Sequence, residues 1–410
     1  MKVQEKRASM GDYASRPRRA DGSQPGWSLP RRAYKDPAIY EQEKEAIFYN
    51  SWIFAGHVND IPGVGDYFLY TLLDETAIIV RSSENVIEAF YNVCRHRGSI
   101  LCKESKGSVK GFTCPYHAWT YKLDGKLMTK RSMGQDFSPE DFSLHPCAIE
   151  IIDGLIFVNF SPTPNKLDRA REELKGPLTL FDFEATKVAV HRSYPIAANW
   201  KVTLENYQEC YHCTPSHPEY AQMHTLTVPE HQFDNYQQPM LDKMAACGLK
   251  HYEIDQQWDH QETGQEQYGY SRYALFETHQ TGSQSGEPIA PLLGSLKGFD
   301  HGASDLNIGP FTYFLIYNDH AVIYVFTPTG PDTSQCDIYW LVRSDAEEGF
   351  DYKIDELTWL WHETTLADER IIVDNQKGIN SRLYKPGPLS KMEYLVDRFS
   401  HWYLDQLHKD

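Results

Sequence analysis

The fold of this chain is decided by two short stretches, Cys94-Arg-His-Arg-Gly98 and Cys114-Pro-Tyr-His-Ala-Trp-Thr-Tyr121. Each stretch carries one Cys and one His, and seventeen residues separate His96 from Cys114. Around them lie short segments of high β propensity, divided by turn residues, at 67–73, 76–81, 86–93 and 154–160. The pattern predicts a small antiparallel β domain over 52–162, in which two hairpin-like loops present the two Cys-His pairs.

Two kinds of metal site use two Cys and two His. Two thiolates on one iron and two imidazoles on the other are the ligand set of a Rieske [2Fe-2S] cluster. A structural zinc ion also takes this set, but its first two ligands are usually about two to four residues apart, whereas only Arg95 lies between Cys94 and His96. We therefore expect the cluster, with the ligands Cys94, His96, Cys114 and His117.

A second group of potential metal ligands lies between Glu205 and His217, in the sequence ENYQECYHCTPSH. The pattern predicts a helix over 200–211, on which Glu209 and His212 share a face. Pro215 is expected to break this helix and to allow His217 to return to the same point. Two His and one carboxylate form the facial triad that binds Fe(II) and leaves positions open for O₂ and substrate.

Cys210 and Cys213 have the spacing of a redox or zinc CxxC motif. No second Cys pair accompanies them. On a helix whose His212 faces iron, the two thiols cannot both face the same way. We therefore favour the iron site over a site made by these two cysteines.

The third iron ligand is expected on a long helix over 354–377 that Gly378 ends. Residues spaced by three or four define one face of this helix, namely Leu357, Trp361, Thr364, Asp368 and Ile372. Because a carboxylate on a mostly apolar stripe is costly unless it is paired or bound to metal, Asp368 is the candidate ligand. The neighbouring acidic residues fall off the stripe and are expected to be solvated: Glu363, Glu369 and Asp374.

Length and patterning complete the predicted architecture, which belongs to the α+β class. A chain of 410 residues suits two domains. We expect an N-terminal tail and helix over 1–51, the small β domain over 52–162, and a larger domain over 163–410. The larger domain is expected to be an antiparallel sheet covered by helices, with strands at 311–317, 321–326 and 337–343.

Composition excludes several classes of partner. The 57 acidic and 40 basic residues give a net charge of −17, which repels nucleic acid and anionic membranes. Apolar runs stop far short of the roughly 20 residues that span a bilayer. The N-terminus lacks the apolar region of a secretory signal, so we expect a cytoplasmic protein with reduced cysteines. A plastid transit peptide, and thus the plastid stroma, is the alternative.

The quoted motifs carry a resemblance to a known family. C-x-H-R-G with C-P-Y-H-x-W-x-Y resembles the Rieske domain of the α subunits of aromatic-ring-hydroxylating oxygenases. The segment 205–217 matches E-N-x-x-E/D-x-Y-H-x4-H at every fixed position. The segment 367–378 is similar to E-D-x-x-I-V-E-x-x-Q-x-G, with Ala367 and Val373 in place of the two Glu.

This resemblance implies roles for individual residues. His212, His217 and Asp368 would bind the mononuclear iron, with Asn206 and Tyr211 near it. Glu209 would bridge His212 to the cluster ligand His117 of a neighbouring subunit, which implies a homotrimer. In respiratory Rieske proteins a Ser and a Tyr bond the cluster sulfurs, and Trp119 and Tyr121 hold those places here. Because Trp119 stands in place of the Ser, one hydrogen-bond donor to sulfur is lost, which should lower the reduction potential of the cluster.

The resemblance also implies an activity. The chain would be a terminal oxygenase that receives electrons from NAD(P)H through a separate flavin/iron-sulfur reductase or a ferredoxin. No G-x-G-x-x-G follows a predicted strand, so the chain itself shows no nicotinamide or flavin site. The alternative of a Rieske electron-transfer protein predicts no second iron site.

For the substrate, the stretches 94–102, 133–140 and 205–213 most resemble the branch that oxidises glycine betaine, stachydrine and choline. We therefore expect hydroxylation or N-demethylation of a quaternary ammonium compound, with an aromatic compound as the alternative. Aromatic residues of the predicted strands could form a cation–π cage or simply strand core: Tyr313, Tyr317, Tyr324, Phe326, Tyr339 and Trp340.

Overall fold

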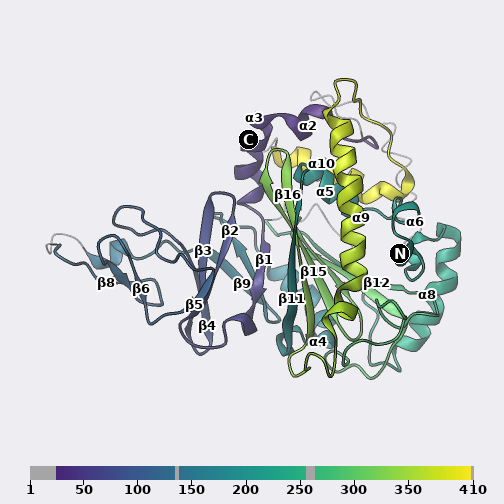
Figure 1. The fold of residues 1–410 in the computed structure, drawn as a ribbon, viewed down its shortest axis with the longest axis horizontal. Helices are drawn as coiled ribbons and strands as arrows, with labels where there is room; N and C mark the ends of the chain where they lie inside the picture. The colour runs from purple at the N-terminus through teal and green to yellow at the C-terminus, as the bar shows by residue number, and fades with distance from the viewer. Residues whose placement is uncertain (1–24, 134–137, 255–263, 408–410) are drawn as a thin grey trace. The chain divides into compact units, whose positions relative to one another are not determined.

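The computed structural model describes residues 25–133, 138–254 and 264–407 (Figure 1). It divides into two compact units, of which the smaller is Tyr49–Asn165 and encloses the expected β domain. The larger unit joins the residues up to Phe48 to Lys166–Asp410. Most of the N-terminal tail, including the region considered for a transit peptide, lies outside the described residues, as does part of the stretch 133–140.

The smaller unit is built from antiparallel strands in three sheets. One sheet has the order β4-β3-β2-β5, and a second has the order β1-β10-β9. The third, β6-β7-β8, carries the second Cys-His loop between β6 and β7. The strands are β1 Ile53–His57, β2 Asp66–Leu72, β3 Glu75–Ser83, β4 Val86–Tyr91, β5 Lys106–Ser108, β6 Phe112–Thr113, β7 Thr120–Tyr121, β8 Leu127–Thr129, β9 Ala148–Ile152 and β10 Leu155–Asn159.

The larger unit contains one six-stranded antiparallel sheet with the order β11-β16-β15-β14-β13-β12. Strands β12 to β16 form a meander. Strand β11, which precedes them in the chain, pairs with β16 along its whole length, from Thr186↔Arg343 to Ile196↔Ser334. The three predicted strands are present as β14, β15 and β16. Strands β11 to β13 were not predicted, because their sequences carry no strong local pattern. The strands are β11 Thr186–Ile196, β12 Tyr268–Ala274, β13 Gly302–Ile308, β14 Thr312–Ile316, β15 Ala321–Gly330 and β16 Thr333–Arg343.

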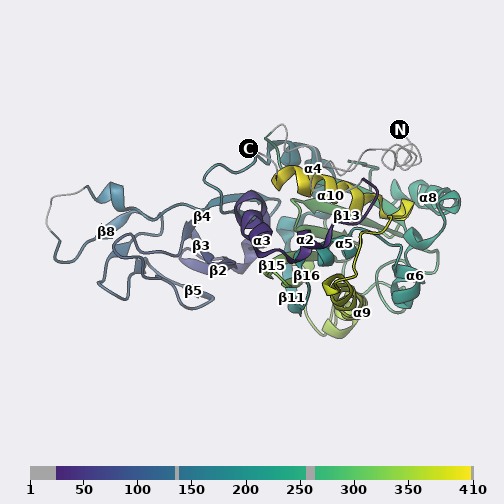
Figure 2. The ribbon, with the colours of Figure 1, turned by 90° about the horizontal axis from the view of Figure 1, so that it is seen from above.

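Helices cover both faces of this sheet, as Figure 2 shows for α9 on one side and α4 on the other. The Tyr324 hydroxyl lies 3.0 Å from that of Thr365 on α9. On the other face, the ring of Phe314 packs on that of Phe183, just after α4. The helices are α2 Arg31–Lys35, α3 Pro37–Glu43, α4 Asp168–Phe181, α5 Trp200–Tyr207, α6 Cys213–Ser216, α7 Pro218–Ala221, α8 Glu230–Met244, α9 Ile354–Asn380 and α10 Tyr394–Leu407. The predicted α+β class is thus confirmed.

Two predicted helix ends are wrong. Helix α5 ends at Tyr207 instead of 211, because the carboxylate of Glu209 accepts the backbone N–H groups of Tyr211 and His212, which then make no helical bond. Helix α9 runs through Gly378 to Asn380. A glycine inside a helix costs only about 1 kcal/mol, and the buried side chain of Ile379 holds the last turn in place.

Within the described ranges, none of the helices is both long and apolar enough to cross a membrane.

Candidate metal centres

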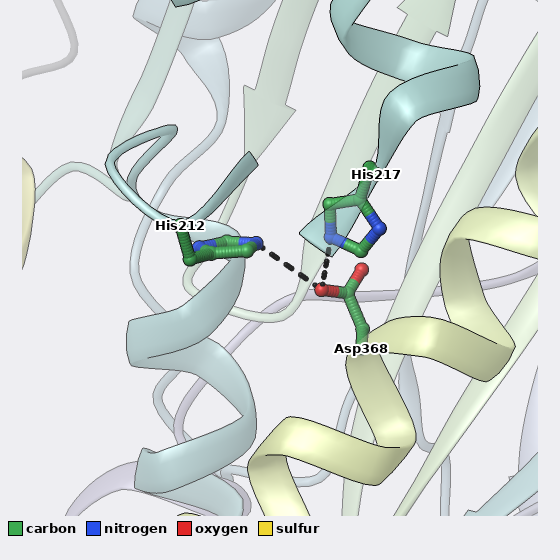
Figure 3. A group of neighbouring side chains, drawn as sticks. All are labelled: His212, His217 and Asp368. Carbon is green, nitrogen blue, oxygen red and sulfur yellow. Dashed lines mark hydrogen bonds and ion pairs between the residues drawn. The ribbon is translucent and has the colours of Figure 1, made fainter. Parts of the chain in front are cut away.

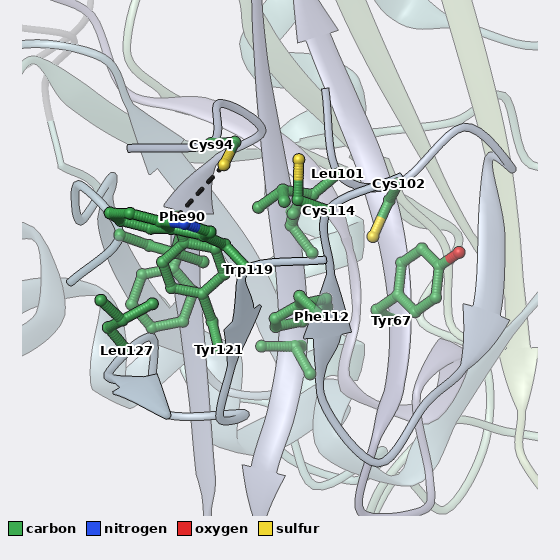
Figure 4. Close-up of a cluster of buried hydrophobic side chains, with 13 residues drawn as sticks. Tyr67, Phe90, Cys94, Leu101, Cys102, Phe112, Cys114, Trp119, Tyr121 and Leu127 are labelled. Atoms are coloured by element: carbon green, nitrogen blue, oxygen red, sulfur yellow. Dashed lines mark hydrogen bonds between the residues drawn. The ribbon is translucent and has the colours of Figure 1, made fainter. Parts of the chain in front are cut away.

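The two Cys-His loops of the smaller unit have the same backbone construction. The N–H of Cys94 donates to the carbonyl of Ser99, five residues on, and the N–H of Cys114 donates to that of Trp119 in the same way (both 2.8 Å). The fourth residue after each Cys has a positive φ, 75° at Gly98 and 58° at Ala118. Two turns of one shape thus present one buried thiol each, in the apolar cluster drawn in Figure 4.

The four side chains fit an iron–sulfur cluster. The thiols of Cys94 and Cys114 lie in one buried cluster and each affects the pKa of the other, as suits two ligands of one iron. The rings of His96 and His117 are 4.6 Å apart between centroids. The Nδ1 atom of each ring is buried and has no hydrogen-bond partner among the described residues. Two orphaned nitrogen lone pairs beside two thiols are the donors that a Rieske cluster requires.

The same geometry argues against a single zinc ion. Tetrahedral zinc would hold four ligand atoms within about 4 Å of one another. Across the described part of the chain, only one group of three or more potential ligand atoms lies within 4.8 Å, and it contains none of these four residues. A cluster of two irons spreads its thiolates and imidazoles further apart.

Two aromatic residues surround the cluster site. The Tyr121 hydroxyl lies 3.3 Å from the Cys94 sulfur. Trp119 stacks on His96, with centroids 4.8 Å apart and planes at 9°. Tyr121 thus keeps a hydrogen bond to sulfur, and Trp119 orients an imidazole.

The second centre is the group of ligand atoms from His212, His217 and Asp368, all within 4.8 Å of one another. The Oδ1 atom of Asp368 lies 2.9 Å from Nε2 of His217 and 3.2 Å from Nε2 of His212. Figure 3 shows both imidazoles converging on the carboxylate that α9 presents. The structure thus brings together all three residues that were expected to bind iron.

Local sequence explains how each histidine reaches this point. His212 precedes α6, in the turn that follows α5. His217 separates α6 from α7 with non-helical dihedrals of −130° and 75°, because Pro218 begins α7 and disfavours the helical conformation in the residue before it. Pro215, which was expected to break the helix, lies inside α6.

Helix α5 is held against α9 by its N-cap. The Asn199 side chain accepts the N–H of Lys201 at 3.0 Å, which satisfies a free donor of the first turn. The Asn199 N–H donates to the side chain of Gln376 on α9 at 2.8 Å. This contact links the segment that carries the histidines to the helix that carries Asp368.

The electrostatics of the group suit a cation. Burial lowers the pKa of His212, but hydrogen bonds with Asp368 and Glu209 outweigh it and raise the pKa to about 10. Burial raises the pKa of Asp368, but bonds with the two histidines outweigh it and lower the pKa. The site therefore attracts positive charge, and two imidazoles with one carboxylate fit Fe(II) with positions left open. The side chains of His212 and Asp368 remain 17% and 22% exposed, so the open side is accessible.

Of the other expected site residues, Glu209 and Asn206 contact His212. Oε1 of Glu209 lies 2.6 Å from Nδ1 of His212, and the Asn206 amide nitrogen lies 3.4 Å from its Nε2. Tyr211 is different, because its side chain is 57% exposed and does not join the group. Its backbone N–H instead donates to Glu209.

Cys210 and Cys213 correct another expectation. The two thiols interact, and this interaction lowers the pKa of Cys210. They can approach because residues 208–212 are not helical, so the helix argument against a shared orientation does not apply.

The aromatic residues of the strands divide between the two faces of the sheet. Strand alternation directs five of the six toward α9, and Tyr339 to the opposite face, where it stacks on His191 at 4.2 Å. Tyr207, which was not among the aromatic residues expected here, also lies on the α9 side, with its ring 4.7 Å from that of Tyr313 and 5.3 Å from that of Tyr324. A more detailed count of aromatic residues around 205–213 would have found it.

Comparisons with known proteins agree with this geometry. Residues 51–144 match the model of the Rieske [2Fe-2S] domain, and residues 183–409 match that of the ring hydroxylating alpha subunit (catalytic domain). The glycine betaine monooxygenase oxygenase subunit of Chromohalobacter salexigens is 35% identical over 384 residues, which cover 93% of this chain and 86% of that protein. The carnitine monooxygenase oxygenase subunit of Escherichia coli is 34% identical over 202 residues, 48% of this chain and 54% of that one.

Solved structures share the fold. A quaternary ammonium Rieske monooxygenase superposes with a TM-score of 0.71 at 24% identity, over 93% of this chain and 96% of that one. Naphthalene 1,2-dioxygenase from Rhodococcus sp. gives 0.68 at 19% identity, over 99% of each chain.

Proposed function

Because the chain belongs to the ring-hydroxylating α subunits that carry a Rieske [2Fe-2S] domain, we propose that it is a terminal oxygenase acting on a quaternary ammonium compound of the betaine type. It is an oxidoreductase. The observation that carries the proposal is the convergence of His212, His217 and Asp368 in a chain that also holds two Cys-His loops.

The residues that would hold the metals follow from the two centres. Cys94, Cys114, His96 and His117 would bind the [2Fe-2S] cluster, and His212, His217 and Asp368 the mononuclear iron. When bound, these groups supply electrons and activate O₂ for insertion into a C–H bond. A pure electron carrier would use only the first set, so the count of irons per chain separates the two functions.

Residues around the metal ligands have supporting roles. Glu209 accepts the Nδ1–H of His212, which fixes the tautomer and leaves Nε2 free for metal. Asn206 lies beside the same imidazole on the side of Nε2. Tyr211, through its backbone N–H, holds the carboxylate of Glu209 in place.

The substrate class is supported by three observations. Relatives matched over most of their length are glycine betaine monooxygenase oxygenase subunits. Aromatic rings gather on the α9 side of the sheet, beside the iron ligands, and can face a cation. The net charge of −17 favours the approach of a cation.

An aromatic substrate is the second candidate. It is supported by the α subunit of biphenyl 2,3-dioxygenase from Rhodococcus jostii, 35% identical over 198 residues. The test is a screen with purified reductase, scored by coupled consumption of NADH and O₂, with glycine betaine, carnitine and biphenyl in parallel. Formaldehyde release identifies N-demethylation. Coupled turnover of biphenyl alone would contradict the betaine proposal.

We also propose the setting in which the subunit acts. Electrons come from NAD(P)H through a separate flavin/iron-sulfur reductase or a ferredoxin. Glu209 would meet His117 of a neighbouring chain, so the active form would be a homotrimer. The eight cysteines are all free, which suits the reducing cytoplasm. Analytical ultracentrifugation tests the oligomer directly.

A further inference from the structure

We propose that Asp305 is the counter-ion for the positive charge of the substrate, and that it makes the site select a quaternary ammonium group over a neutral group of the same shape. This inference rests on the proposed function and adds a residue that determines specificity.

Asp305 lies on β13, on the face of the sheet that carries the aromatic side chains. It pairs across the sheet with Ser271 on β12 and Leu315 on β14. Because opposite residues of antiparallel strands point to the same face, Asp305 shares its face with Tyr313, two residues from Leu315. Its neighbours Ser304 and Leu306 point to the opposite face, where Ser304 contacts Arg272.

The carboxylate of Asp305 has no hydrogen bond or ion pair with any of the residues that the structure describes. Three acidic side chains of the same unit that are fully buried are paired. Asp300 bonds Arg272 at 2.6 Å, Asp319 bonds His320 at 2.8 Å, and Glu43 bonds Lys201 at 2.5 Å. A buried carboxylate without a partner is costly, and sequences retain one where a ligand supplies the missing charge.

Asp305 is surrounded by protein but remains accessible. Burial raises the pKa of its carboxyl group to about 7, and no cation from the described parts of the chain offsets that effect. Asp305 nevertheless keeps part of its surface exposed to solvent, whereas Ser304 and Leu306 on either side of it are buried. A small molecule can therefore reach the carboxylate.

Uncharged groups surround the carboxylate. The pKa values of Tyr207, Tyr273 and Tyr317 are raised, mainly by burial and next by the charge of Asp305. All three hydroxyls therefore stay neutral. Burial lowers the pKa of His224, which lies 2.9 Å from the Tyr317 hydroxyl, to about 3, so this histidine is neutral too. None of the described residues around Asp305 thus supplies a positive charge, and in our proposal the ligand supplies it.

This region continues into the metal centre. The charges of Asp305 and His212 both act on the thiol of Cys210, which lies next to the triad. Its sulfur lies 3.5 Å from the Tyr220 hydroxyl, and the ring of Tyr220 lies 5.8 Å from that of Trp361, on the stripe of α9 that carries Asp368. A cation near Asp305 is thus close to the iron ligands.

The chemistry favours a quaternary ammonium over other cations. Such a group has no N–H to donate, so it needs no directed acceptor. It is attracted by a nearby negative charge and by aromatic faces, and its methyl groups suit an apolar lining. A single carboxylate among tyrosine rings provides these features.

The test compares Asp305→Asn with Asp337→Asn in the purified holoenzyme. Asp337 lies on the opposite face of the same sheet, where it bonds His191 at 2.9 Å, so its variant removes one carboxylate charge away from the site. Isothermal titration calorimetry measures the binding of glycine betaine and of 3,3-dimethylbutanoate, which has the same shape with carbon in place of nitrogen.

We expect Asp305→Asn to weaken the binding of glycine betaine at least tenfold, and to leave 3,3-dimethylbutanoate unchanged or bound more tightly. Asp337→Asn should bind both as the unaltered protein does, and Asp305→Glu, which keeps the charge, should retain the preference for betaine. The unaltered protein should itself prefer betaine by at least tenfold, a result that does not depend on how any variant folds.

Each contrary result has a separate meaning. If Asp305→Asn binds betaine within twofold of the unaltered protein, or if the unaltered protein does not distinguish the two probes, the inference is wrong. In that case, betaine turnover driven by NADH still supports the proposed function. If no quaternary ammonium compound is turned over at all, the proposed function fails, and this inference fails with it.

Discussion

The Nδ1 atom of His212 lies 2.6 Å from Oε1 of Glu209, across a turn of three residues that is not helical. The other oxygen of Glu209 accepts the backbone N–H groups of Tyr211 and His212. One carboxylate therefore both shapes the turn and orients the imidazole. Few lone pairs of Glu209 remain free, and in our proposal these accept a ring N–H of His117 from a neighbouring chain.

Glu209→Gln should separate metal binding from electron supply. The amide keeps the size and one acceptor, but it cannot accept N–H groups on both sides as a carboxylate does. We expect both centres to remain loaded, while turnover driven by NADH falls by more than about 100-fold and turnover driven by peroxide falls much less. Iron analysis and both assays check this. Normal NADH-driven turnover would exclude the bridging role.

Asp368→Ala should remove the mononuclear iron and leave the cluster intact, because the two ligand sets lie in different units of the chain. Turnover should fall below about 1%. Glu363→Ala is the matched control, since Glu363 is exposed on the same helix, five residues before Asp368. Metal content and the spectrum of the cluster check the prediction. Unchanged iron in Asp368→Ala would move the third ligand to another acidic residue of α9.

Cys94→Ser should abolish the low-average-g electron paramagnetic resonance signal of a histidine-ligated cluster, while the mononuclear site still binds metal. Cys102→Ser is the control. Cys102 is also buried, and burial raises the pKa of its thiol to about 11, so it remains a protonated thiol and no ligand. Loss of the signal in Cys102→Ser, or its survival in Cys94→Ser, would contradict the assignment.

Tyr121→Phe should lower the reduction potential of the cluster. Its hydroxyl, whose pKa is raised by burial, remains protonated and donates toward the Cys94 sulfur at 3.3 Å. This bond favours the more negative, reduced cluster. A hydrogen bond worth about 1 kcal/mol corresponds to roughly 40 mV for one electron. Redox titration checks the shift, and an unchanged or higher potential would mean that the hydroxyl does not act on the cluster.

The pH dependence of kcat/KM for betaine should report Asp305. Burial raises the pKa of this group to about 7, so the carboxyl group is charged above that pH and neutral below it. We therefore expect kcat/KM to rise as the pH increases through about 7 and then to level off. The hydroxyls that face Asp305 stay neutral over this range. Persistence of the same rise in Asp305→Asn would assign it to another group.

Sequence by itself determined the features whose signals are local. The spacing of Cys94, His96, Cys114 and His117 predicts a cluster because each pair lies within one short loop. The stripe on α9 identified Asp368 because helical periodicity places its neighbours inside the protein. Strands with alternating or apolar patterns were found for the same reason.

Tertiary structure decided what depends on contacts between distant segments. Strand β11 pairs with β16, about 150 residues away, and nothing in its own pattern specifies that partner, because pairing depends on the whole sheet. The turn at 208–212 replaced the predicted helix because the Glu209 side chain competes for the backbone N–H groups. The meeting of Asp368 with His217 required α5 and α9 to pack together through Asn199 and Gln376.

Asp305 shows the difference most clearly. In the sequence it is one acidic residue among 57, in a strand without a strong pattern. What distinguishes it is the absence of a cation near its carboxylate among the described residues, whereas Asp300, Asp319 and Glu43 each have one. The free energy of a charge enclosed by protein depends on every group around it, and those groups come from β12, the residue after β14 and the end of α5. Only the folded chain brings these segments together.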